Sequence, residues 1–266
     1  MMSRKYLPTM RKRQKFVLAA IILAGGLWSI HAMPIDLEWR YGLVGLLTGV
    51  AAVLAGWALR EGLSGLEWLT VLLPPSLFTA GVGLFYILLP SHWLARLVIV
   101  ALFGIGQYTL LLTANIFSVA AIRTIALFRA AVAVGFVMTL LTGFFLYDSI
   151  LSFRSGFLVT APVVVVVSAL LLLPALWSVN LEEKMTWKLI KYSLWLAVSQ
   201  GLLALGVSLW PVSLAVASLF LTTMLYVYLG IAQHHFAQRL FSRTVWEYVT
   251  VGIVVLATML ITAGLG

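Results

Sequence analysis

Long uncharged stretches separated by short charged segments dominate the chain. Eight such stretches have 18 or more residues, at positions 16–35, 41–59, 68–95, 97–122, 130–147, 155–181, 192–238 and 248–266. The stretch 192–238 is interrupted by Trp210-Pro211 and is long enough to hold two spans. Because a helix needs about 20 apolar residues to cross a bilayer, the pattern predicts nine transmembrane helices.

We expect the spans at about 16–31, 41–59, 66–89, 97–121, 130–147, 158–177, 192–210, 212–231 and 245–265. The connections are short, so we expect a basic segment over 1–15 followed by a single transmembrane domain over 16–266. The predicted fold class is all-α, a polytopic helical bundle. Hydrophobic side chains make up 63% of the chain and charged ones 9%, against about 45–50% and 25% in soluble domains. This composition excludes a water-soluble fold.

The basic residues predict the orientation of the bundle. With a cytoplasmic N-terminus, 14 of the 17 lysines and arginines lie in inner segments, and only Arg40, Arg96 and Arg154 lie outside. Cytoplasmic loops carry such an excess, so we expect a cytoplasmic (inner) membrane, the N-terminus inside and the C-terminus outside. The net charge of +9 then indicates contact with anionic lipids at the cytoplasmic face, and no nucleic acid. A protein partner or a second copy stays open.

The sequence offers no site for a cofactor or a metal. Cysteine is absent, which excludes thiolate ligands and thiol catalysis. His234 and His235 are adjacent and point to different sides of a helix, so they cannot bind one metal ion together. We therefore expect neither a cofactor nor a metal.

Polar side chains inside the spans are few. In the fourth span Gln107, Tyr108 and Asn115 fall within one 100° sector at helical spacing, and the seventh span holds Gln200. Such an intramembrane stripe either lines a substrate path or forms hydrogen bonds between helices, and we favour the hydrogen bonds. Intramembrane charge, the usual mark of an ion pathway, is almost absent, which disfavours an ion-coupled pump.

Charged residues gather at the predicted outer face. Three carboxylates lie there, Asp36, Glu38 and Asp148. The three outer arginines, Arg40, Arg96 and Arg154, are candidates for binding a phosphate group. A carboxylate in this position can act as a general base. The Asp36-x-Glu38 pattern is also similar to the acidic loop of membrane glycosyltransferases that use lipid-linked sugars. The alternative, which we favour, is ordinary solvated loop charge.

Two spans carry faces of small residues at helical spacing. The second span has Gly42, Gly45, Gly49, Ala52 and Gly56, and the seventh has Ser193, Ala197, Gln200, Ala204 and Ser208. Small faces let helices approach closely, so we predict that both faces point inward. An amide in hydrocarbon needs a partner, and we expect Gln200 to bond across a helix interface, with Asn115 or Gln107 as candidate partners.

These observations favour a non-catalytic membrane protein. It either handles an apolar or lipid-like molecule in the manner of a permease, or serves as a membrane subunit or scaffold of a larger assembly. The alternative is an enzyme that acts on a lipid-linked substrate at the outer face through Asp36, Glu38 or Asp148.

Overall fold

The computed structural model describes residues 11–32, 36–60, 67–89, 92–118, 125–181 and 186–264. Within these ranges the chain forms nine helices, α1 (Lys12–Ala32), α2 (Leu37–Leu59), α3 (Glu67–Leu88), α4 (Trp93–Ser118), α5 (Ile125–Ser152), α6 (Phe157–Asn180), α7 (Trp187–Ser208), α8 (Leu214–Phe236) and α9 (Ser242–Gly264). The predicted helical bundle is confirmed. Of the predicted basic segment 1–15, residues 1–10 lie outside the described residues, and Lys12 already belongs to α1.

All nine helices are long and apolar enough to cross a membrane. They contain 21 to 28 residues, which at about 1.5 Å per residue is about 31 to 42 Å, against a hydrocarbon core of about 30 Å. Several helices run past the predicted spans into basic residues, as α7 does at Lys188 and Lys191. Long basic side chains can extend to the headgroups from there. The chain is a multi-pass helical membrane protein.

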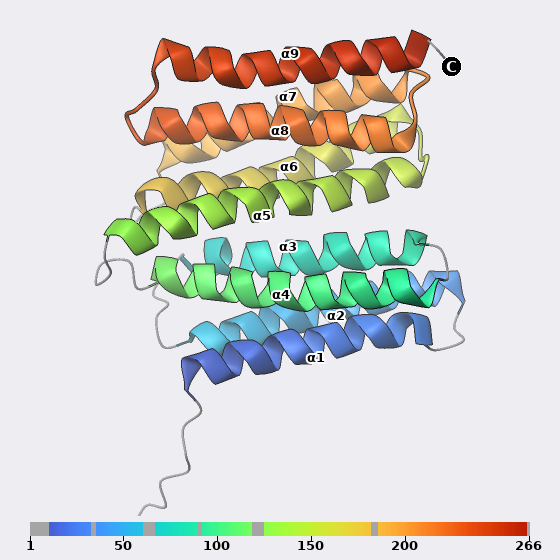
Figure 1. The fold of residues 1–266 in the computed structure, drawn as a ribbon, viewed down its shortest axis with the longest axis vertical. Helices are drawn as coiled ribbons and strands as arrows, with labels where there is room; N and C mark the ends of the chain where they lie inside the picture. Colours follow the sequence, from blue (N-terminus) through green and yellow to red (C-terminus); the bar gives the residue numbers. More distant parts are fainter. Residues whose placement is uncertain are drawn as a thin grey trace, which may run out of the picture.

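The helices lie side by side and alternate in direction, with α1 at one edge of the bundle and α9 at the other (Figure 1). The helices α1 to α4 pack against one another, α5 contacts both α3 and α4 on one side and α6 and α8 on the other, and α9 packs chiefly on α8. The most extensive helix contact joins α6 and α7. We name the two ends of the bundle the Arg60 end and the Arg154 end; the sequence predicts the Arg154 end to be outside.

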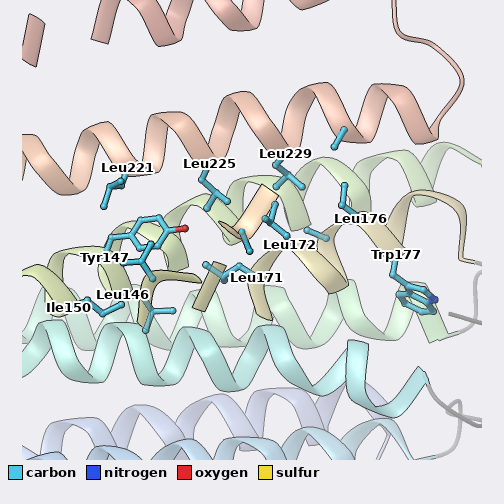
Figure 2. Close-up of a cluster of buried hydrophobic side chains, with 14 of the residues drawn as sticks. Leu146, Tyr147, Ile150, Leu171, Leu172, Leu176, Trp177, Leu221, Leu225 and Leu229 are labelled. Carbon is cyan, nitrogen blue, oxygen red and sulfur yellow. The ribbon is translucent and has the colours of Figure 1, made fainter. Parts of the chain in front are cut away.

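The hydrophobic core has two centres. In the first four helices Phe78 and Phe103 stack with ring centroids 5.6 Å apart. The larger cluster includes Tyr147 of α5, Leu171 and Leu172 of α6 and Leu225 of α8 (Figure 2). The two clusters are joined through α3 and α5, so the bundle forms one continuous packed unit.

The inward small face is confirmed for α7 from Ser193 to Ala204, but Ser208 at the end of the helix is exposed. Ala197, Gln200 and Ala204 have no exposed surface, and Ser193 is 3% exposed. Gly201 beside them lies against α6, where an added Cβ atom would collide with the Val165 side chain. Close approach of this kind explains why α6 and α7 share so much contact.

The same prediction is wrong for most of the α2 face. A Cβ atom added at Gly42, Gly45 or Gly49 would meet no atom within 4 Å, and these glycines lie on the exposed side of α2. The helix instead buries its bulkier face, which includes Val44 and Leu47.

The reason lies in the neighbouring helices, which supply the glycines. Gly26 of α1 faces Leu47, and Gly83 of α3 faces Val44. Large side chains of α2 thus fit into gaps made by small residues of α1 and α3, which gives dense packing without a small face on α2 itself. Only Gly56 of the predicted face is buried, against Trp68.

Candidate functional site: a cavity at the Arg154 end

A cavity of about 230 Å³ lies between α5, α6, α7 and α8 at the Arg154 end. Most of its lining residues are apolar, but polar atoms make up nearly half of the lining surface. The polar groups come from Arg154, Thr160, Ser208 and Trp210, each from a different element or connection. Ligand sites combine an apolar wall with a few convergent polar groups, and this cavity has that composition.

A tight connection between α5 and α6 places Arg154 in the cavity wall. Arg154 has a φ of 48°, and Gly156 two residues later has a φ of 78°. Glycine adopts this left-handed region without a steric cost, whereas an arginine there is uncommon. The Arg154 backbone N–H donates to the Leu151 carbonyl oxygen over 3.2 Å, which fixes the turn directly after α5.

Two helices begin at the cavity. Phe157 opens α6 and Leu214 opens α8, and both line the cavity. Neither the preceding Gly156 nor the preceding Ser213 caps its helix with a side-chain hydrogen bond. The first N–H groups of a helix lack partners within the helix and attract anions. The two helix starts and Arg154 supply positive charge at this cavity, while α5 and α7 end at the same cavity with their last carbonyl groups.

Buried hydrogen bonds hold the helices together beneath the cavity. The Ser218 hydroxyl donates to Asp148 Oδ1 over 3.0 Å and so joins α8 to α5. The Tyr147 hydroxyl lies 2.8 Å from the Ser168 hydroxyl, which joins α5 to α6. Gln200 Nε2 of α7 donates to the carbonyl oxygen of Leu221 in α8. These bonds link α5 to α6 and α8, and α7 to α8, beside the cavity.

The donors left available in the cavity suit an anion, and Trp210 indicates that the cavity lies near the lipid headgroups. The hydroxyls of Thr160 and Ser208 donate to carbonyl oxygens of their own helices, at Gly156 and Ala204. Their protons are therefore engaged, and Arg154 and the helix N–H groups remain as the donors. Trp210 is 48% exposed, which is typical of an indole anchored at headgroup level.

The comparison with known proteins gives a family. Residues 17–262, which include parts of all nine helices, match a family described as a protein of unknown function (DUF5656). The chain belongs to the DUF5656 family. No curated protein and no solved structure matches the chain. The DUF5656 match extends over all the residues that line the cavity at the Arg154 end.

The three predicted outer carboxylates of this DUF5656 protein lie outside the cavity lining. Asp36 and Glu38 are exposed at the start of α2. Asp148 is half-buried in α5 and bonds to Ser218, three residues before Leu151, which does line the cavity. Only Asp148 therefore lies near the cavity.

Of the three predicted phosphate-binding arginines, the cavity includes only Arg154. Arg40 is half-buried in the first turn of α2. Arg96 is half-buried in the first turn of α4 and acts electrostatically on Tyr86 of α3. The arginines thus belong to three different helix ends.

The predicted polar stripe is divided between different surroundings. Gln107 is fully buried, and its Nε2 donates to the Pro75 carbonyl oxygen over 2.9 Å and to the Thr79 hydroxyl. Tyr108 lines an apolar groove of about 440 Å³ between α1 and α4, and Asn115 is 6% exposed in the bundle. Gln107 forms the interhelical bonds that we favoured.

The bond of Gln200 crosses a helix interface as expected, but its partner is the Leu221 carbonyl oxygen. The prediction that Asn115 or Gln107 would be the partner is wrong, because α7 packs mainly on α6 and α8. The sequence reasoning also missed Thr160, Ser208 and Trp210 as cavity residues. The signal that could have found them is the pair of helix breaks at Gly156 and Pro211, which sit at the same predicted face.

Proposed function

We propose that this DUF5656 protein is a non-catalytic protein of the cytoplasmic membrane that binds a lipid-like molecule with an anionic headgroup at the outer face. The observation that carries the proposal is the placement of Arg154 and two uncapped helix starts, at Phe157 and Leu214, in one cavity. Arginine and helix N–H groups are the donors that proteins use for phosphate.

The size of the cavity fits a headgroup and not a whole lipid. A volume of about 230 Å³ holds a phosphate and its immediate substituents, while the tail stays in the hydrocarbon beside the bundle. Lipid tails are as apolar as leucine, so moving a tail from bilayer to protein gains little. The headgroup contacts at Arg154 therefore determine which lipid binds.

A binding role suits this lining better than an enzymatic one. General acid–base catalysis needs a titratable group within hydrogen-bond reach of the reacting atoms. Among the described residues, Arg154 is the one charged residue in the lining, and Asp148 is engaged with Ser218. The cavity therefore offers recognition of negative charge without a general base.

In this proposal the Arg154 end lies outside the cytoplasm, because most of the basic residues belong to segments at the opposite end. Reporter fusions after Asp36, His92 and Arg154 are expected to be external, and a fusion after Thr186 cytoplasmic. A cytoplasmic result at Arg154 would contradict the orientation and would move the site to the inner leaflet.

The binding itself is tested by native mass spectrometry of the full chain with phosphatidylglycerol or phosphatidylcholine. Arg154→Gln is expected to lower retained phosphatidylglycerol about fivefold, because one basic group near a membrane surface contributes about 1 kcal/mol. Arg40→Gln, at the same end but outside the cavity lining, is the matched control and is expected to retain the lipid. Equal retention in both variants would refute the site.

A further inference from the structure

A second cavity lies at the opposite, Arg60 end of the bundle, between α2 and α3. Its volume is about 480 Å³. Ala52, Gly56 and Trp57 of α2, Arg60 directly after α2, and Trp68 of α3 contribute to its lining. None of these residues takes part in the cavity at Arg154.

Small residues leave the space for this cavity, which we also call the hollow, and two tryptophans border it. A Cβ atom added at Gly56 would be 3.1 Å from the Trp68 ring, so the indole already lies close against the α2 backbone. Trp57 is 41% exposed and borders the opening. Beyond Ala52 a Cβ atom added at the exposed Gly49 or Gly45 would meet nothing within 4 Å.

Two cations border the same hollow. Arg60 follows the last residue of α2 and lines the cavity. Lys15 of α1 places its Nζ 5.6 Å from the centre of the Trp57 ring, a cation–π geometry. Positive charge and tryptophan at a helix end are characteristic of the headgroup level of a membrane. Toward the middle of the bundle the hollow is lined by apolar residues.

We propose that this cavity binds one anionic phospholipid, with its phosphate at Arg60 and one acyl chain along Ala52 and Gly56. Charge complementarity identifies the occupant. An apolar wall alone gains only dispersion contacts from a lipid tail and selects no headgroup, whereas Arg60 with Lys15 nearby favours a negative one. The phospholipid would fill the space that neither α2 nor α3 occupies.

The test is native mass spectrometry of the full chain, with phosphatidylglycerol and phosphatidylcholine added in turn. Arg60→Gln is expected to lower the ratio of retained phosphatidylglycerol to phosphatidylcholine about fivefold, and Arg60→Lys to keep most of it. Ala52→Phe fills the hollow and is expected to lower retention of both lipids. Arg239→Gln, an exposed basic residue at the same end of the bundle, is the matched control and is expected to leave the ratio unchanged.

Several outcomes would overturn the proposal. One is an equal effect of Arg60→Gln and Arg239→Gln, which would indicate general surface charge. Displacement of the lipid by millimolar inorganic phosphate would point to a free-anion site. A dimer that Ala52→Phe dissociates would show that a second copy occupies the hollow. Unchanged thermal unfolding of Arg60→Gln confirms that the variant is folded. The Arg60 comparison is repeated in the Arg154→Gln background, so that phosphatidylglycerol held at the other cavity does not contribute to the ratio.

Discussion

The small-residue faces of α2 and α7 have similar spacing in the sequence, but most of the α7 face is buried and most of the α2 face is exposed. In α7 the residues Ala197, Gln200 and Ala204 are fully buried. In α2 the residues Gly42 and Gly45 lie on the exposed side with open space around them. The comparison shows that a small face permits close helix contact without requiring it.

The difference is explained by what the neighbouring helix presents. The α7 face meets α6, whose Val165 projects toward Gly201. In α2 the relation is reversed, because the glycines Gly26 and Gly83 belong to the neighbours and α2 provides Leu47 and Val44. Either helix of a pair can supply the small residue, and the dispersion energy of the contact is similar in the two cases.

The most severe test of the α6–α7 contact is Gly201→Val. The new side chain would collide with Val165 and would lie close to the Ala161 carbonyl oxygen, 3.1 Å from the added Cβ. Overpacking of this kind costs about 3 kcal/mol or more of unfolding free energy, measurable by titration with a denaturing detergent. Gly206→Val in the same helix, where nothing lies within 4 Å, is the matched control. Equal stability of the two variants would mean that α6 and α7 are not in close contact.

The next largest effect is expected for Ala204→Leu. Ala204 has no exposed surface, so three added carbon atoms must displace neighbours in the α7 interface. We expect a loss of about 2 kcal/mol in unfolding free energy, measured in the same titration. Leu202→Ala, at a position that is 65% exposed, is the control and should change little; a larger loss there would indicate that the opposite face of α7 is the buried one.

A smaller effect is expected for Gln200→Leu. This change removes the bond from Nε2 to the Leu221 carbonyl oxygen, and interhelical hydrogen bonds within membranes contribute about 0.6 kcal/mol on average. The adjacent Ser199→Ala removes a hydroxyl bonded only to the Trp195 carbonyl of its own helix and serves as the control. A gain in stability for Gln200→Leu would show that the buried amide is a cost to the fold.

The smallest effect is expected for Gly45→Leu in α2. Because a Cβ atom at Gly45 would meet nothing within 4 Å, the new side chain should extend into lipid, and the unfolding free energy should change by less than about 0.5 kcal/mol. A loss near that of Ala204→Leu would place Gly45 in a contact, either inside the bundle or with a second copy. Gel filtration of the variant distinguishes these two explanations.

The candidate site was only partly predictable. Arg154 was identified from its position among the outer charges, because few charged residues interrupt the apolar spans. Thr160, Ser208 and Trp210 were not, since they come from three different segments and meet only because α5, α6, α7 and α8 converge at one end. The same convergence leaves Asp36 and Glu38 on α2, outside this group of helices.

The sequence by itself determined the nine apolar helices found in the described residues, their approximate ends and the fold class. The physical reason is that a bilayer of fixed thickness demands about 20 apolar residues per crossing and leaves no unpaired backbone group in hydrocarbon. These constraints act on each segment separately, so local composition is sufficient. The helix α1 could be found without any knowledge of α4, its neighbour in the bundle.

Only the tertiary structure decided which face of each helix is buried and which residues meet. Lipid is as apolar as the side chains it surrounds, so an exposed leucine or glycine has no cost that would mark it in the sequence. The orientation of α2 and the partner of Gln200 therefore depend on shape complementarity between helices, a property of pairs. That is why Gly45 and Ala204, alike in the sequence pattern, lie on opposite sides of the boundary between lipid and protein.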